Sequence, residues 1–256
     1  RGKHAMAGIP CLVSSSRGRI FVDSNDWRRS CEMLSRTFGV VSFSPATRVG
    51  SDLDVLTEEI VKFAEPLMFA GASFAIRARR SGNHPYTSQV VCEKAGSAVL
   101  AANRQRDISV NLDEPDVEIS VEIRDREAFL FNSTLPGPGG LPRSTQGRVL
   151  GLLTSRRGIA AAWLLMKRGC TVIASCDDDD LSDALKVWDA DLKVVERSDD
   201  TFALATEKGC LAIAKDWSLS ELEGAVMPKG DVPVFYPLVG FDDVETENLL
   251  DKITRT

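Results

Sequence analysis

LLTSRRGIAAAWLLMKRG, residues 152–169, has the pattern of a strand end, a short turn and a helix. In many nucleotide-binding proteins, the backbone N–H groups at such a junction hold a phosphate. A turn of this kind usually needs several glycines, because glycine accepts positive φ angles. This one has only Gly158, preceded by Arg156 and Arg157. The stretch therefore predicts an α/β fold and leaves open whether its loop binds a nucleotide.

The rest of the chain after this stretch alternates between short apolar runs and helical patterns. That alternation predicts a doubly wound parallel sheet. The expected strands are 149–153, 171–174, 192–195, 211–214 and 234–236, and the expected helices are 159–168, 180–188, 201–208, 219–226 and 244–253.

A linker precedes this domain. LPGPGGLPRSTQG, residues 135–147, contains three prolines and four glycines, so we expect neither helix nor ladder strand there. Upstream of it, strand and helix patterns predict an α+β region, with strands at 19–23, 40–45, 73–78, 117–124 and 128–131 and helices at 27–38, 53–64 and 87–103. We therefore expect a ferredoxin-like unit over 1–65, a second α+β domain over 66–134, and the α/β domain over 148–256.

Composition excludes several classes of protein. No apolar run approaches the roughly 20 residues of a membrane span. The six cysteines contain no C-x-x-C pair, which argues against a zinc knuckle or a disulfide framework and is typical of a reducing cytoplasm. The net charge is −6, and residues 147–256 carry thirteen Lys and Arg against twenty Asp and Glu. A polyanion should therefore meet the first two domains.

A cluster of basic residues lies in FAIRARRSGNHPYTS, residues 74–88. The strand delivers Arg77, Arg79 and Arg80 into a loop that contains His84 and Tyr86. Arginines beside a polar loop and a helix start can bind RNA phosphates through charge and N–H donors. The alternative is a solvated strand face with a few ion pairs, which the neutral composition of this region favours when taken alone.

This stretch, together with PDVEISVEIR at 115–124, resembles the THUMP domain, an RNA-binding module of tRNA-modifying enzymes. Four further segments are similar to the THUMP-containing tRNA 4-thiouridine sulfurtransferases, which are also known as thiamine-biosynthesis proteins. They are GRIFVDS at 18–24, GPGGLPRSTQGRVL at 137–150, AAWLLMKRGC at 161–170 and YPLVGFDDVETENLLDKI at 236–253.

The resemblance implies a tRNA partner, bound by THUMP with the ferredoxin-like unit, notably at the tRNA 3′ end. It implies a PP-loop domain that uses ATP and Mg²⁺ to adenylate a uridine oxygen, which sulfur from a cysteine persulfide then replaces. It also implies a homodimer and a sulfur-donor protein as partners, and no membrane.

The loop departs from the pattern of that family, which is S-G-G-[FI]-D-S-P. Here Thr154 can replace the first serine, and Ser155, Arg156, Arg157 and Gly158 follow. Two glycines, the acidic residue and the proline are missing. Side chains with a Cβ resist the positive φ angles of a tight anion nest, so the loop favours residual anion binding over an aligned ATP with its metal.

The other candidate groups also lack support for chemistry. The persulfide cysteine of the family follows the segment at 236–253, at a position beyond Thr256. No histidine lies after the linker, which excludes a Cys/His nucleophile pair in that domain. The acidic run at 177–180 is either a metal site or, as we expect, a solvated helix start. We therefore assign no catalytic and no metal-binding residue.

Three functions remain open. The first is a tRNA-binding protein of this family that has lost its own adenylation and persulfide chemistry, and the residues favour it. The second is an active ATP-dependent tRNA sulfurtransferase, or an adenylating subunit with an unusual loop that another chain completes. The third is a homologue retained in sulfur or thiamine metabolism without RNA.

Overall fold

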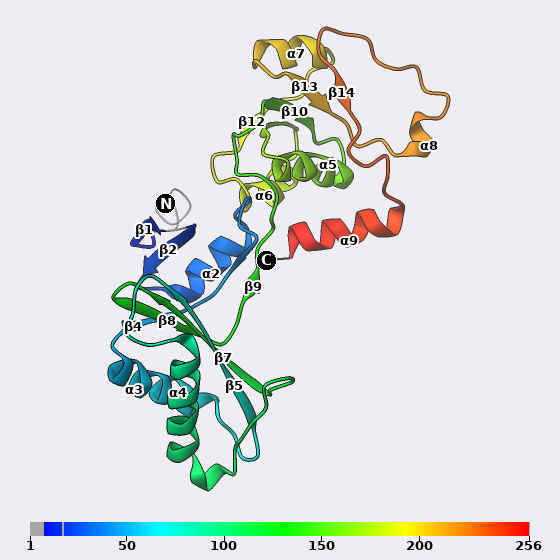
Figure 1. The fold of residues 1–256 in the computed structure, drawn as a ribbon. Coiled ribbons are helices and arrows are strands. Elements are labelled where there is room, and N and C mark those ends of the chain that lie inside the picture. The colour runs from blue at the N-terminus through cyan, green and yellow to red at the C-terminus, as the bar shows by residue number, and fades with distance from the viewer. Residues whose placement is uncertain (1–7, 17, 256) are drawn as a thin grey trace. The chain divides into compact units, whose positions relative to one another are not determined.

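A computed structural model describes residues 8–16 and 18–255. The chain forms two compact units. Unit 1 comprises residues 1–43 and 136–256, and unit 2 comprises residues 44–135 (Figure 1). The start of the expected ferredoxin-like unit, residues 1–7, lies outside the described residues. The expected order of an α+β region followed by an α/β domain is confirmed.

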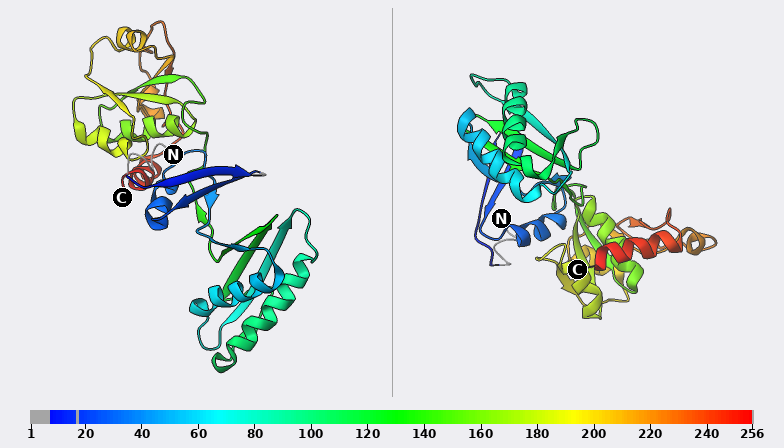
Figure 2. Two further views of the ribbon diagram at one scale, coloured as in Figure 1. Left: turned by 90° about the vertical axis from the view of Figure 1, so that its left-hand side faces the viewer. Right: turned by 90° about the horizontal axis from the view of Figure 1, so that it is seen from below.

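Unit 2 is a mixed β-sheet with two helices on one face (Figures 1 and 2). Its five strands lie in the order β4-β8-β7-β5-β6. β5 pairs in parallel with β6 and β7, whereas β8 is antiparallel to β4 and β7. The strands are β4 (Thr47–Gly50), β5 (Ser73–Ser81), β6 (Ser109–Val110), β7 (Val117–Arg124) and β8 (Glu127–Phe131).

The helices of unit 2 are capped by side chains, and each buries one row of residues against the sheet. They are α3 (Leu53–Ala64) and α4 (Ser88–Ala102), with 3₁₀ turns η1 (Glu65–Leu67) and η2 (Arg104–Arg106). Asp52 caps α3 and Thr87 caps α4 by accepting backbone N–H bonds. Alternation along β7 places Ile119, Val121 and Ile123 in the core that these helices cover.

The boundary between the first two domains differs from the one expected at residues 65 and 66. Leu56 and Ile60 of α3 are fully buried and share one core with Phe74 of β5. Because its apolar stripe packs on this sheet, α3 belongs to unit 2, which begins at Ser44. Of the strand expected at 40–45, only β3 (Ser42–Phe43) forms, and β4 follows it after Pro45.

The N-terminal part of unit 1 is small. β1 (Cys11–Ser16) and β2 (Arg19–Ser24) form an antiparallel hairpin, followed by α2 (Trp27–Ser35). β3 pairs with β9 (Leu135–Pro136), the first two residues of the expected linker. The elements expected as one ferredoxin-like unit are therefore distributed over both units. β1 was not expected from the sequence, because its second half is a run of serines.

The rest of unit 1 is a parallel sheet in the order β12-β11-β10-β13-β14. All four pairings are parallel, as the alternation of strands and helices predicts. The strands are β10 (Arg148–Leu152), β11 (Thr171–Ser175), β12 (Lys193–Val195), β13 (Ala212–Ala214) and β14 (Val234–Phe235).

Helices cover both faces of this sheet, so it is doubly wound (Figure 1). One face packs against α5 (Arg156–Lys167), α6 (Asp179–Lys186) and α9 (Asp243–Thr254). The other packs against α7 (Thr201–Glu207). Between β13 and β14 the chain forms only α8 (Leu219–Leu222), which is shorter than the helix expected at 219–226.

The linker lies against the end of α5 that is remote from the candidate loop. Leu141 N–H donates to the carbonyl of Lys167 at 3.0 Å. A Cβ at Gly140 would come within 2.2 Å of the same carbonyl oxygen, so only glycine permits this approach. Nearby, Phe38 stacks on Trp188 with ring centroids 5.4 Å apart and contacts Trp163 edge-on at 5.5 Å. These contacts fix the segments that flank residues 44–135 onto the α/β part of unit 1.

Candidate functional site

The first candidate is the start of α5. Ser155 is the N-cap, with an extended backbone, and its side chain accepts the N–H of Arg157. Gly158 is buried, and a Cβ there would lie 2.6 Å from the carbonyl oxygen of Leu152. Its backbone is helical rather than left-handed. The glycine therefore allows α5 to pack closely on β10, and it does not shape an anion nest.

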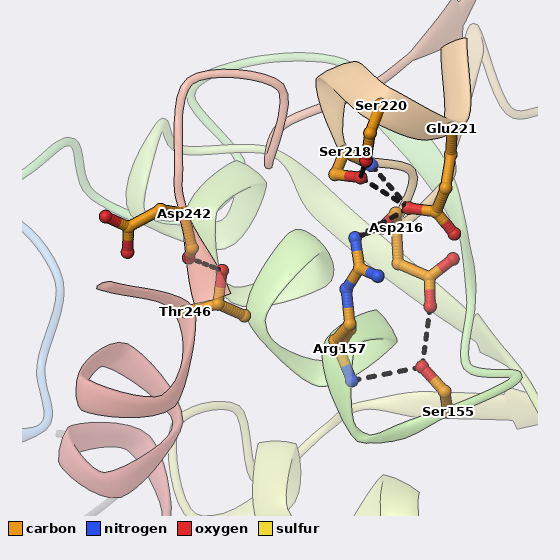
Figure 3. A network of polar contacts seen from close by, with 8 residues as sticks. All are labelled: Ser155, Arg157, Asp216, Ser218, Ser220, Glu221, Asp242 and Thr246. Carbon is orange, nitrogen blue, oxygen red and sulfur yellow. Dashed lines mark hydrogen bonds and ion pairs between the residues drawn. The ribbon is translucent and has the colours of Figure 1, made fainter. Parts of the chain in front are cut away.

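A polar network joins this turn to the loop after β13 (Figure 3). The Ser155 hydroxyl donates to Asp216 Oδ2 at 2.6 Å. Arg157 Nη2 donates to the Asp216 carbonyl oxygen at 2.8 Å and forms an ion pair with Glu221 Oε2, also at 2.8 Å. Glu221 itself closes a capping box with Ser218 at the start of α8. We call these five residues the α5–α8 network.

The network lies at a defined point of the fold. β10 and β13 are neighbours, and the strand order reverses between them, because β11 and β12 lie on one side of β10 and β13 and β14 on the other. In doubly wound sheets, ligands bind outside the carboxyl ends of the strands at this switch point. Here the two loops are joined directly by hydrogen bonds and an ion pair.

Electrostatics keep the network charged. The pKa of Glu221 is lowered, chiefly because the Ser218 backbone N–H donates to its carboxylate at 2.7 Å; burial opposes this, and the Ser218 hydroxyl and Arg157 lower it further. Burial lowers the pKa of the neighbouring Lys215, whose ammonium lies 3.5 Å from the centroid of the Trp217 ring. Glu221 is therefore ionised at neutral pH and holds Arg157 by charge.

The structure brings only some of the expected loop residues together. Ser155 and Arg157 meet in the network, whereas the exposed Arg156 lies 3.9 Å from Glu247 of α9. Thr154 is exposed. Asp216 was not expected as a site residue, although it lies two residues after a buried parallel strand, and that position is a recognisable signal.

The acidic run at 177–180 serves local structure. Asp178 caps α6 by accepting the N–H of Asp180, and Asp177 accepts the N–H of Arg197. Within residues 8–16 and 18–255, no group of three or more His, Cys, Asp or Glu is arranged to hold a metal ion. All six cysteines are free.

The second candidate is the basic strand β5 and the loop that follows it. Arg77 forms an ion pair with Glu118 of β7, Nε to Oε2 at 3.3 Å. Arg79 is exposed and has no side-chain partner among the residues that the structure describes. Arg80 Nη1 donates to the carbonyl of His84 at 3.2 Å, and no carboxylate of the described residues forms an ion pair with it. β5 thus carries one arginine in an ion pair, Arg77, and two arginines that pair with no carboxylate of the described residues, Arg79 and Arg80.

Three segments meet beyond the end of β5: residues 50–52, 81–86 and 124–127, which we call the loop junction. The carbonyl of Asp125 accepts the Ser51 hydroxyl at 2.9 Å and contacts His84 Nε2 at 2.7 Å. Tyr86 is buried in the core, and its hydroxyl donates to the carbonyl of Ser51. His84 and Tyr86 therefore fix the loops together, and Tyr86 has no exposed ring on which a base could stack.

The loop junction also contains a basic residue that the sequence did not suggest. Arg126 is exposed in the turn between β7 and β8, and its backbone carbonyl accepts Ser51 N–H. Its neighbour Arg124 is largely buried and is paired with Glu122 at 2.6 Å. Arg79, Arg80 and Arg126 are thus three guanidinium groups at one end of the sheet that no carboxylate of the described residues neutralises.

Comparison with known proteins gives two sequence findings. Residues 50–132 match the THUMP domain. The probable tRNA sulfurtransferase of Methanothermobacter thermautotrophicus is 32% identical over 306 residues, which cover 96% of this chain and 77% of that protein. The corresponding protein of Methanobrevibacter smithii is 39% identical over 185 residues, which cover 69% of this chain and 47% of that protein. The match thus spans less than half of this second relative.

Two solved structures share the fold over nearly the whole chain. The crystal structure of PH1313 from Pyrococcus horikoshii has a TM-score of 0.80 at 27% identity and covers 98% of this chain and 90% of that one. A 4-thiouridine synthetase–RNA complex with bound ATP has a TM-score of 0.76 at 20% identity, and covers 99% and 78%. At that identity the likeness concerns the fold alone. Among the described residues, no helix is both long and apolar enough to cross a bilayer.

Proposed function

The chain belongs to the family of probable tRNA sulfurtransferases, and on this basis we propose that it binds tRNA through unit 2 and has lost its own adenylation chemistry. The observation that carries the binding is that Arg79, Arg80 and Arg126, at one end of the sheet within the THUMP match, have no carboxylate partner among the described residues. Guanidinium groups that no carboxylate neutralises are free to contact RNA phosphates. The other arginines of this sheet are less available, because Arg77 and Arg124 form ion pairs.

The α5–α8 network supports the loss of adenylation. Ser155 and Arg157, which would face a phosphate at the switch point, already bind Asp216 and Glu221. A triphosphate placed there would meet two carboxylates of the chain itself. Gly158 is used for packing, and the loop has no further glycine. These residues do not suit ATP with Mg²⁺, so we assign no step through that cofactor.

A second candidate function is an active ATP-dependent tRNA sulfurtransferase, or an adenylating subunit that another chain completes. The observation that favours it is the parallel sheet, whose five strands and flanking helices are all present in doubly wound order. In that case a second copy of this chain and a sulfur-donor protein would be partners, and thiamine biosynthesis would be a further role. The two functions differ in whether the protein binds ATP.

The tRNA-binding assignment is tested by a gel-shift titration of unfractionated tRNA with the wild type and the variant Arg79→Ala/Arg80→Ala/Arg126→Ala. Arg104→Ala is the matched control, because it removes an exposed arginine at the opposite end of the same unit, in η2. We expect the triple variant to bind at least tenfold more weakly at low salt and the control to bind like the wild type.

The salt dependence provides the second readout. Each lost phosphate contact should reduce the slope of log affinity against log salt by about 0.7–0.9. Unchanged affinity and slope in the triple variant, with its circular dichroism spectrum intact, would show that Arg79, Arg80 and Arg126 do not contact the tRNA.

A further inference from the structure

The segment that supplies Asp216 and Glu221 is weakly anchored. α8 has four residues, and Leu219 at its start is 58% exposed. The side chains of the Arg157–Glu221 ion pair are 31% and 43% exposed. Ion pairs with this exposure are worth little, because water and salt screen them. The contact that holds α8 against the start of α5 can therefore open without unfolding the domain.

The same contact fills the positions that an anion would take. Arg157 Nη2 donates to the Asp216 carbonyl and to the Glu221 carboxylate, and the Ser155 hydroxyl donates to the Asp216 carboxylate (Figure 3). Guanidinium and hydroxyl groups bind phosphoryl oxygens through these same donors. Two negative charges from the loop after β13 thus compete directly with any phosphate at the switch point.

We propose that Asp216 and Glu221 form an autoinhibitory latch, which occupies Arg157 and Ser155 in place of a pyrophosphate group and keeps the switch point closed. Neutralising the two carboxylates while preserving their shape opens the position to a pyrophosphate-bearing ligand. The latch extends the proposed function, since it explains why this domain does not bind ATP. It makes no use of the RNA-binding arginines of unit 2.

The test is calorimetric titration of inorganic pyrophosphate into the full chain at neutral pH and low salt. The opened variant is Asp216→Asn/Glu221→Gln, which keeps the shape of both side chains and removes the two negative charges that hold Ser155 and Arg157. The control is Asp183→Asn/Asp251→Asn, which removes two negative charges from exposed helical ion pairs of the same unit. The control separates the latch from the general charge of unit 1.

We expect the opened variant to bind pyrophosphate at least tenfold more tightly than the wild type and the control. Adding Arg157→Ala to the opened variant should abolish the gain. Three results would each overturn the latch: tight binding by the wild type, no gain in a folded opened variant, or a gain that survives Arg157→Ala. If the double variant fails to fold, Glu221→Gln alone is titrated and must show a smaller gain in the same direction. tRNA binding should be the same in all these variants, so failure of the latch is distinguishable from failure of the tRNA assignment.

Discussion

The hydroxyl of Ser155 donates to the carboxylate of Asp216 at 2.6 Å and so joins the end of β10 to the end of β13, the two strands between which the sheet order reverses. In a ligand-binding member of this fold class, that position is left for the ligand. Here it is occupied by the carboxylate of Asp216, which follows Ser155 by 61 positions in the chain.

Arg157→Ala should loosen α8 while leaving the fold intact. The side chain of Glu221 is partly exposed, so we expect a change in the free energy of unfolding of no more than about 1 kcal/mol. The local effect should be larger, with faster amide hydrogen exchange over residues 217–224. Arg255→Ala, which removes an exposed helical pair with Asp251, is the control and should leave that segment unchanged. Equal protection of the segment in both variants would show that Arg157 does not hold it.

The contribution of Glu221 to stability should depend on pH in one direction. Its pKa is lowered in the folded state, first by the Ser218 backbone N–H, so the folded state favours the ionised form. The contribution is therefore complete above the usual glutamate pKa of about 4.3 and is lost as the pH falls through the lower folded value. In urea unfolding, Glu221→Gln should differ from the wild type at pH 7, and the difference should shrink steadily below pH 4. A difference that grows in acid would contradict this assignment.

The close packing of α5 on β10 predicts opposite effects at two glycines. Gly158→Ala places a Cβ 2.6 Å from the Leu152 carbonyl oxygen and should destabilise unit 1 by about 1–3 kcal/mol. Gly96 lies within α4, and a Cβ added there would have no neighbouring atom within 4 Å, so Gly96→Ala should be neutral or stabilising by up to about 1 kcal/mol. Thermal unfolding of the two variants checks the contrast, and equal effects would be inconsistent with the packing described.

The aromatic cluster of unit 1 should be sensitive to Phe38. Phe38 is 8% exposed and contacts both Trp163 and Trp188, so Phe38→Ala should destabilise unit 1 by about 3–5 kcal/mol. Phe69→Ala is the comparison, because Phe69 is 56% exposed and its loss should change stability by less than about 0.5 kcal/mol. Urea unfolding followed by far-UV circular dichroism gives both values, because it reports on unit 1 and on unit 2, which has no tryptophan. A small effect at Phe38 would mean that this segment is not docked on α5 and α6.

The parallel sheet could be predicted from the sequence, because alternation of buried runs and amphipathic helices is local. The place of α3 could not. The apolar residues Leu56 and Ile60 predict that α3 has one buried face. Only the fold shows that this face packs in one core with Phe74 and Ile119. The boundary expected at residues 65 and 66 therefore lies well after Ser44, where unit 2 begins.

The candidate sites were predicted in part for a similar reason. Residue type pointed to Arg157 and Arg79, yet the partners that decide their roles are distant in sequence: Glu221 follows Arg157 by 64 residues. Tyr86 in a basic loop suggested an RNA-binding residue, but it is buried and its hydroxyl donates to the carbonyl of Ser51, 35 residues away. Arg126 was overlooked because a single arginine in a turn carries no pattern.

The most direct test of the account is calorimetric titration of ATP with Mg²⁺ into the wild-type chain, alone and after saturation with tRNA. We expect tRNA to bind and ATP to give no saturable heat in either state, because Asp216 and Glu221 occupy the groups that would hold its phosphates. Saturable binding of one ATP per chain in either state would contradict it and would favour an active adenylating domain.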